Sequence, residues 1–211
     1  MAISCDALQV YEGLGVLTGA ASAEERAGLE HRLVGFVPVT QPFSVGDYMP
    51  LAHAEVDRAL GAGRRPIVVG GTGLYLRAAV AELSLVKAEP DAEGSELWSP
   101  RTRHPTTIFG LDMDRALLYE RIGARTEAIV AAGALEEVRR ADALGPGRTA
   151  RKALGFDELL AGDVELMKKR SRNYARRQLT WQRKIPNLHP IDRSGLSDAE
   201  VAKLMADRLR R

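Results

Sequence analysis

The stretch Pro66-Ile67-Val68-Val69-Gly70-Gly71-Thr72-Gly73-Leu74-Tyr75 decides the fold class of this chain. It begins as a short apolar strand, turns through glycines, and leads into a segment over residues 74–81 that we expect to be helical. A strand, a glycine turn and a helix in direct succession are the signature of an α/β crossover. The chain is therefore predicted to be an α/β protein with a parallel sheet flanked by helices.

Further strand and helix signals flank this stretch. Residues 2–6 resemble the last part of a buried strand that ends at Asp6, residues 33–39 a short strand that Pro38 ends, and residues 106–111 another strand. Helices are expected from the capping box at Ser44 to Gly61, from Asp114 to about Ala132, over about 165–185, and after a second capping box at Ser197. Together these elements predict one mixed α/β unit.

Length and composition narrow the class of protein. A chain of 211 residues with 45% hydrophobic and 27% charged residues fits one globular domain over residues 1–211. The single cysteine, Cys5, excludes an internal disulfide, and the sequence has no Cys/His cluster with zinc spacing. No apolar run approaches the roughly 20 residues of a membrane span, and Met1 is not followed by a basic signal-peptide segment. We expect a cytoplasmic monomer with no membrane partner.

The net charge of +2 conceals a strong asymmetry along the chain. Residues 168–184 contain eight basic residues and no acidic one, and without those eight the rest of the chain holds 22 basic against 28 acidic residues. A mildly acidic body with one dense basic stripe indicates a polyanionic partner at a defined place. We call these residues the basic stripe: Lys168, Lys169, Arg170, Arg172, Arg176, Arg177, Arg183 and Lys184.

The helix that carries the basic stripe also carries aromatic residues. Lysine and arginine neutralise phosphates, while Tyr174 and Trp181 are able to stack on exposed bases, which favours an RNA partner. The alternative is a solvated helix face with Trp181 packed in the core. Because solvated faces usually mix the two signs of charge, we give both interpretations equal weight from these residues alone.

Other candidate groups are weaker when each is taken alone. The turn at residues 70–73 has no following lysine and misses the dinucleotide-binding spacing, so a structural turn is its more common meaning. Thr72 and Asp6 each follow a predicted strand, where ligands of parallel sheets bind, although an aspartate there often only caps a loop. Arg121 and Arg125 lie one helical turn apart and either clamp a diphosphate or face solvent.

Four blocks in this order nevertheless resemble one family, the tRNA dimethylallyltransferases (tRNA isopentenyltransferases). The blocks are Asp6-Ala7-Leu8-Gln9-Val10-Tyr11, the opening stretch over residues 66–75, Ala150-Arg151-Lys152-Ala153-Leu154-Gly155-Phe156-Asp157-Glu158-Leu159, and Arg176-Arg177-Gln178-Leu179-Thr180-Trp181-Gln182-Arg183. The helix start at residues 43–48 and the segment from Leu118 to Arg125 are similar too. The resemblance covers nearly the whole chain.

The resemblance implies a reaction and its catalytic groups. The family transfers a dimethylallyl group from dimethylallyl diphosphate to the exocyclic N6 of an adenine next to the anticodon of tRNA. The residue matching the general base is Asp6, and Thr72 would orient the amine. Magnesium (Mg²⁺) and the arginine matching Arg125, with Arg121 beside it, would stabilise the diphosphate leaving group.

The same resemblance implies a tRNA-binding surface for the anticodon stem-loop. The adenine must leave its stack to reach the donor, so base flipping accompanies the chemistry. The matching residues are Asp6, Ala7, Leu8, Gln9, Lys152, Ala153, Leu154, Gly155, Phe156, Arg176, Arg177, Gln178, Leu179, Thr180, Trp181, Gln182 and Arg183. The basic stripe points to the same polyanionic partner independently.

Two features of the family pattern are not matched. The family fold is a P-loop-kinase-like parallel sheet that starts with a strand and a Gly-x-x-x-x-Gly-Lys-Ser/Thr loop, whereas here Asp6 is preceded by five residues only. The family also carries a helical insertion where residues 86–104 stand as a shortened linker. Because one missing preorganised donor costs about 10²–10³ in rate, we expect little or no transferase activity from this chain alone.

Two alternatives to the prenyltransferase stay open. The first is a non-catalytic RNA-binding remnant of such an enzyme, which would bind RNA but not dimethylallyl diphosphate. The second is a related enzyme that prenylates free adenylate, against which the basic stripe argues because a mononucleotide offers few phosphates to neutralise.

Overall fold

The computed structural model describes residues 1–84 and 96–210 and holds two parallel sheets. In the first sheet β1 (Ala2–Ser4) lies between β2 (His31–Arg32) and β3 (Ile67–Val69), and both pairings are parallel. In the second sheet β4 (Ile108–Asp112) pairs with β5 (Leu188–Asp192), also in parallel. The predicted parallel α/β architecture is confirmed, with its strands divided between two sheets.

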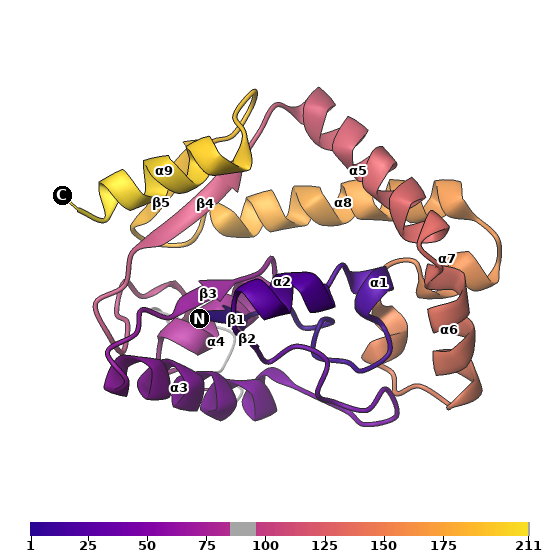
Figure 1. Cartoon of the computed structure of the whole chain (residues 1–211), viewed down its shortest axis with the longest axis horizontal. Helices are drawn as coiled ribbons and strands as arrows, with labels where there is room; N and C mark the ends of the chain where they lie inside the picture. Colours follow the sequence, from indigo (N-terminus) through magenta and orange to yellow (C-terminus); the bar gives the residue numbers. More distant parts are fainter. Residues whose placement is uncertain (85–95, 211) are drawn as a thin grey trace, which may run out of the picture.

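Helices flank these sheets, and the longest of them crosses the molecule. The helices are α1 (Gly15–Thr18), α2 (Ala23–Gly28), α3 (Val45–Gly61), α4 (Gly73–Val80), α5 (Arg115–Ala131), α6 (Ala134–Ala143), α7 (Phe156–Leu160), α8 (Val164–Gln182) and α9 (Asp198–Arg208), with short 3₁₀ turns at Glu96–Trp98 and Ala150–Lys152. Figure 1 shows α8 running from α7 at one end to β4, β5 and α9 at the other, with α5 alongside it. The helix that carries the basic stripe is therefore a central element of the fold.

Capping side chains fix the helix starts that the sequence predicts. The capping boxes at Ser44 and Ser197 are both formed, with Asp47 and Glu200 closing them. The carboxylate of Asp114 accepts hydrogen bonds from two N–H groups in the first turn of α5. Each cap satisfies donors that would otherwise lack a partner at a helix start.

The core consists of three clusters of buried apolar residues. The largest joins the segment after β1 to α6 and α7 and includes Tyr11, Leu14, Val138 and Phe156. A second cluster packs α3 against α4, and a third lies between β1 and α3. The segment after β1 is thus held between α6 and α7, which fixes where the chain following Asp6 can lie.

Two strand expectations need correction. The strand expected at residues 33–39 is instead β2 at His31–Arg32, because Leu33 and Gly35 both adopt a left-handed φ of 59° and break the extended chain. Strand β5 was not expected, since Pro190 lies in its middle. Each strand of a two-stranded sheet is an edge strand, where a missing proline N–H is tolerated.

The linker expected at residues 86–104 is only partly described. Residues 86–95 of it lie outside the described residues, and the part that follows is anchored by Arg77 of α4. The Arg77 guanidinium is 1% exposed and donates hydrogen bonds to the carbonyl oxygens of Leu97 (2.9 Å), Ser99 (2.8 Å) and Arg101 (3.3 Å). One buried side chain therefore holds the returning segment against α4.

Strand β3 has one partner among the described residues, β1, and its outward side chains are open to solvent. Ile67 is 54% exposed and Val69 is 52% exposed, although both are apolar strand formers. Apolar edge strands of this kind favour pairing with other chains, so this edge is the part of the first sheet most open to association.

Gly155, between the 3₁₀ turn and α7, offers a test of core packing. Its φ is +98°, and a Cβ there would lie 2.6 Å from Met167 Cε and 2.8 Å from Leu17 Cδ1. Gly155→Ala should lower the free energy of unfolding by about 1–2 kcal/mol for the left-handed backbone and by a further ~1–3 kcal/mol for overpacking. Gly162→Ala is the matched control, since φ is +70° there and no atom lies within 4 Å of the new Cβ. Equal losses in urea unfolding of the two variants would show that the contacts of Gly155 contribute nothing.

Candidate active site and nucleic-acid interface

Asp6 holds the turn that follows β1 with one oxygen of its carboxylate. Oδ1 accepts hydrogen bonds from the N–H groups of Leu8 (2.8 Å) and Gln9 (3.3 Å). Oδ2 makes no hydrogen bond to any residue within 1–84 or 96–210. The loop-capping role and a chemical role are therefore compatible, because the second oxygen is available to accept a proton.

Thr72 ties the glycine turn to the Asp6 turn. It precedes α4, but its hydroxyl does not cap that helix and instead accepts a hydrogen bond from the N–H of Ala7 (3.2 Å). Gly70 permits this approach, since a Cβ there would lie 2.9 Å from the carbonyl carbon of Cys5 and 3.0 Å from the backbone nitrogen of Asp6. The structure brings together the two candidates that follow neighbouring parallel strands.

Cys5 itself is a core residue. Its side chain is 0% exposed, and burial raises the pKa of the thiol to about 12. A thiol with a pKa that high is not a nucleophile at neutral pH. Cys5 is therefore a free, buried thiol.

One face of α8 docks onto the glycine turn. Gln178 Nε2 donates a hydrogen bond to the carbonyl oxygen of Gly71 (3.0 Å), and a Cβ on Gly73 would lie 2.4 Å from the Trp181 ring. Tyr174 is half-buried on the same side of α8, and this burial is the main cause that raises the pKa of its phenol. Tyr174, Gln178 and Trp181 are spaced as one helix face, so the glycines serve helix packing. The sequence did not reveal this, because the partners are about a hundred residues apart.

The opposite face of α8 carries exposed cations, but fewer than the basic stripe contains. Lys168 pairs with Glu127 (2.9 Å) and Glu165 (2.8 Å), and Arg170 pairs with the buried Glu158. The other six form no ion pair with a residue that the structure describes: Lys169, Arg172, Arg176, Arg177, Arg183 and Lys184. The charged surface available to a polyanion is therefore smaller than the basic stripe, because Lys168 and Arg170 are already paired.

Arg125 reaches the Asp6 turn indirectly, through the end of α1. Its Nη2 donates to the carbonyl oxygen of Thr18 (3.3 Å) and its guanidinium packs against Gly19. Gln9 Nε2 donates to the carbonyl oxygen of Gly19 (3.2 Å) from the other side. Arg125 has no hydrogen bond to Asp6 or Thr72, and Arg121 is exposed one helical turn earlier on α5.

The block at residues 152–156 lies largely inside the protein. Phe156 is 0% exposed and Ala153 is 4% exposed, and both belong to the largest core cluster. Lys152 is exposed and Leu154 is half-buried. Only these last two side chains of the block are accessible to a large ligand.

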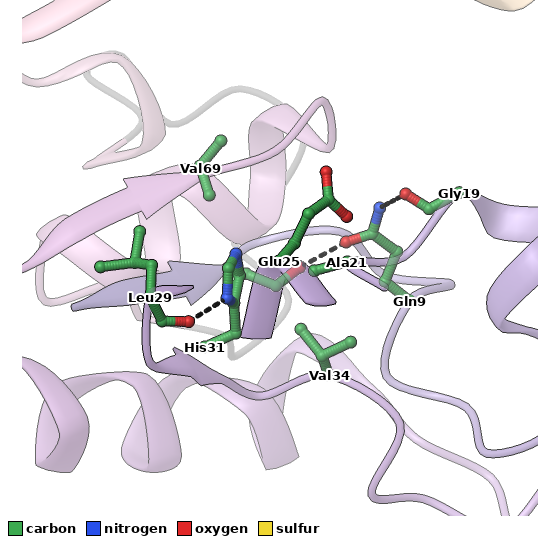
Figure 2. A pocket seen from close by; sticks show the side chains of 9 residues that line it. Gln9, Gly19, Ala21, Glu25, Leu29, His31, Val34 and Val69 are labelled. Atoms are coloured by element: carbon green, nitrogen blue, oxygen red, sulfur yellow. Dashed lines mark hydrogen bonds between the residues drawn. The ribbon is translucent and has the colours of Figure 1, made fainter. Parts of the chain in front are cut away.

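A pocket of about 470 Å³ lies beside the Asp6 turn (Figure 2). It is lined by Ser4, Gln9, Gly19, Ala21, Glu25, Leu29, His31, Val34 and Val69. Ser4 Oγ donates to Gln9 Oε1 (3.0 Å) and accepts from the N–H of Asp6 (3.2 Å), which connects the pocket to the turn. No local motif could have predicted it, because its walls come from four separate segments.

Residues 1–84 and 96–210 contain neither a metal cage nor a helix able to span a membrane. No group of three or more His, Cys, Asp or Glu side chains is placed to hold a metal ion there. No helix in these ranges has the length and apolar character needed to cross a bilayer.

Fold and site together define an α/β enzyme whose carboxylate and hydroxyl lie at the carboxyl ends of neighbouring parallel strands, beside a cationic helix. A family model described as IPP transferase matches residues 9–98 and 89–185. The chain belongs to the tRNA dimethylallyltransferase family.

Similar proteins agree with this membership. The tRNA dimethylallyltransferase of Rhodospirillum centenum is 36% identical over 86% of this chain and 79% of its own length, and that of Salinispora tropica is 32% identical over 92% and 80%. The crystal structure of the full-length tRNA isopentenylpyrophosphate transferase from Bacillus halodurans matches 99% of this chain and 88% of its own, with a TM-score of 0.83 and 26% identity. These matches extend the family likeness from sequence to fold.

Proposed function

We propose that this chain transfers a dimethylallyl group from dimethylallyl diphosphate to N6 of the adenine adjacent to the anticodon in tRNA. The observation that carries the proposal is the hydrogen bond from the Ala7 N–H to the Thr72 hydroxyl, which ties the turn that contains Asp6 to Thr72. Family membership supplies the reaction, and this geometry supplies groups able to perform it.

In this mechanism Asp6 is the catalytic base. The N6 lone pair forms a bond to the first carbon of the dimethylallyl group, the bond from that carbon to the diphosphate oxygen breaks, and the N6 proton passes to Asp6 Oδ2. The exocyclic amine is a poor nucleophile because its lone pair is delocalised into the ring, so removing its proton matters for the rate. The Thr72 hydroxyl orients the amine for this attack.

The donor is proposed to occupy the pocket beside the Asp6 turn. Its prenyl chain fits against apolar walls such as Leu29, Val34 and Val69. Gly19 also lines the pocket, and the Arg125 guanidinium packs against it, so this cation is proposed to meet the diphosphate. Arg121, one helical turn away, adds a second positive charge on the same side of the site.

Magnesium fits this site as a companion of the donor. Mg²⁺ usually keeps several waters and is held by phosphate oxygens with at most one or two carboxylates. When bound, it neutralises charge on the departing diphosphate. We assign no side chain of this chain as its ligand.

The anticodon stem-loop is proposed to lie along the exposed face of α8. Arg176, Arg177, Thr180 and Arg183 are exposed there, and Lys152 and Leu154 offer accessible side chains near α7. The segment over residues 6–9 would meet the flipped adenine. We further propose a single transferase domain over residues 1–211, with the linker at residues 86–104, acting as a monomer in the cytoplasm.

Single-turnover prenylation tests the proposed function directly. The chain, in excess over an anticodon stem-loop, is incubated with dimethylallyl diphosphate and Mg²⁺, and the RNA is followed by mass spectrometry. One added dimethylallyl group on the adenine is expected, formed at the low rate that the sequence predicts for this chain alone. Binding of RNA without product would favour the RNA-binding remnant, and modification of free adenylate in preference to RNA would favour the nucleotide enzyme.

If the exposed face of α8 binds RNA phosphates, the affinity for the stem-loop should depend on the salt concentration. Arg183→Gln and Arg176→Gln should each weaken stem-loop binding and reduce the slope of log K against log salt by about 0.7, the value for one lost phosphate contact on a single strand. Lys168→Gln is the matched control, because that charge lies on the same helix but is already paired with Glu127 and Glu165. Fluorescence anisotropy titrations at several salt concentrations measure the slopes. An equal loss from the control would mean that the exposed face is not the binding surface.

A further inference from the structure

Glu137 is a carboxylate of α6 that the proposed mechanism does not use. Its Oε1 accepts a hydrogen bond from the backbone N–H of Val16 and its Oε2 accepts one from the N–H of Leu17, each at 3.0 Å. Glu137 forms no ion pair with a residue within 1–84 or 96–210, so these two N–H groups are its bonding partners there. One side chain therefore ties α6 to the first turn of α1 (Figure 1).

Helix α1 depends on a cap from outside, because it has four residues only. The first N–H groups of a helix have no acceptor within it, and a single turn is too short to be stable alone. The preceding residue, Leu14, offers no capping side chain, and the first turn of α1 contains no acidic residue. Glu137 supplies the missing acceptors, and its negative charge at the helix start is also favoured by the helix dipole.

The other end of α1 holds Arg125, the arginine proposed to meet the diphosphate. The carbonyl oxygen of Thr18 accepts a hydrogen bond from Arg125 Nη2 at 3.3 Å, and the guanidinium packs against Gly19. The Arg125 side chain is exposed and forms no ion pair in the part of the chain that the structure describes, so α1 is what fixes its direction. A guanidinium has five N–H donors, and most of them remain for a ligand.

Arg125 and Glu137 belong to consecutive helices, α5 and α6, which meet at Gly133. Together they hold α1 at both of its ends, with the carboxylate on the first N–H groups and the guanidinium on a carbonyl oxygen of the last residue. Both charges have the sign that the helix dipole favours at that end. A displacement of α1 at Glu137 would therefore move the carbonyl oxygen that orients Arg125.

We propose that Glu137 is a positioning residue that holds α1 so that the Arg125 guanidinium is directed toward the diphosphate of the donor. This inference rests on the proposed function. Glu137 acts through the backbone of α1 and contacts neither the donor nor the RNA. Its loss should therefore weaken the use of the donor, while the RNA surface on α8 stays as it is.

Glu137→Gln keeps the shape of the side chain but removes its charge and one of its two acceptors. In single-turnover reactions with saturating stem-loop, the donor concentration that gives the half-maximal rate should rise about tenfold, as for one lost hydrogen bond to a charged group. Stem-loop affinity should stay unchanged. Glu136→Gln is the matched control, because this neighbouring carboxylate is exposed and its cation, Arg139, is 4.0 Å away. A donor dependence of Glu137→Gln equal to that of the unmodified chain would overturn the proposal.

A double-mutant cycle separates positioning from a general loss of stability. In an Arg125→Gln background the further change Glu137→Gln should have little effect on the donor dependence, because the group that α1 orients is already gone. A loss of stability, measured by urea unfolding, should appear in both backgrounds and so does not imitate this pattern. A full tenfold change in the Arg125→Gln background would show that Glu137 acts independently of Arg125, which contradicts the proposal.

Hydrogen exchange tests the contact without a variant and without turnover. In the unmodified chain the Val16 and Leu17 amides should exchange at least about tenfold more slowly than in an unfolded peptide of the same sequence, since Glu137 holds both N–H groups. Exchange of both amides at the unprotected rate would overturn the proposal. Slow exchange in a chain that transfers no prenyl group would instead refute the proposed function, with the contact itself intact.

Discussion

Asp6→Asn should lower the single-turnover rate of dimethylallyl transfer by about 10²–10⁴-fold, because it removes the general base. Asparagine keeps an acceptor oxygen for the N–H groups of Leu8 and Gln9, so the turn after β1 should persist. The variant cannot accept the N6 proton, because a neutral amide is not a base at neutral pH. Stem-loop affinity and urea unfolding should therefore remain unchanged.

Asp163→Asn provides the matched control for Asp6→Asn. Asp163 also accepts a backbone hydrogen bond with Oδ1, from the N–H of Leu166 at 2.8 Å, but it caps the start of α8, away from Thr72. Its transfer rate should equal that of the unmodified chain. A rate for Asp6→Asn within about tenfold of the unmodified chain would assign the proton to another acceptor, since base catalysis contributes more than that.

The positions of Asp6 and Thr72 after their strands could be predicted from the sequence, whereas the contacts that hold the glycine turn against α8 could not. Asp6 and Thr72 were each predicted to follow a strand, at the edge where ligands of parallel sheets bind, and the bond from the Ala7 N–H to Thr72 ties their two turns together. Their chemical roles stay predictions. The docking of α8 was not foreseen, because a hydrogen bond from Gln178 to Gly71 joins residues that share no local pattern. A contact between two single side chains that are far apart in the chain produces no periodic pattern in the sequence.

The ion pairs of the basic stripe could not be predicted from the sequence either. Residues 168–184 contain no acid, and yet Lys168 and Arg170 are neutralised by Glu127 of α5 and Glu158 of α7. Composition counts charges along the chain, whereas a ligand meets only those that packing leaves unpaired. The basic stripe therefore overestimated the number of unpaired cations that this part of the chain presents to a ligand.

Arg77→Met should lower the free energy of unfolding by about 2–4 kcal/mol. Arg77 is 1% exposed, and no carboxylate pairs with it in the part of the chain that the structure describes. Its guanidinium serves three carbonyl oxygens of residues 97–101. Methionine fills a similar volume but leaves those acceptors without a donor, at about 1–3 kcal/mol for each that stays buried.

Arg77→Met should also affect the candidate site, because the segment that Arg77 holds contacts α8 through the two tryptophans of the chain. Trp98 lies in the segment that Arg77 holds, and its ring centroid is 4.8 Å from that of Trp181, which packs over Gly73. Arg77→Met should therefore shift native tryptophan emission to longer wavelength and slow transfer. Arg101→Met makes the same change at an exposed side chain of the same segment and should cost less than about 0.5 kcal/mol. Unchanged emission and stability in Arg77→Met would mean that other contacts hold this segment, and that α8 keeps its position over the glycine turn without it.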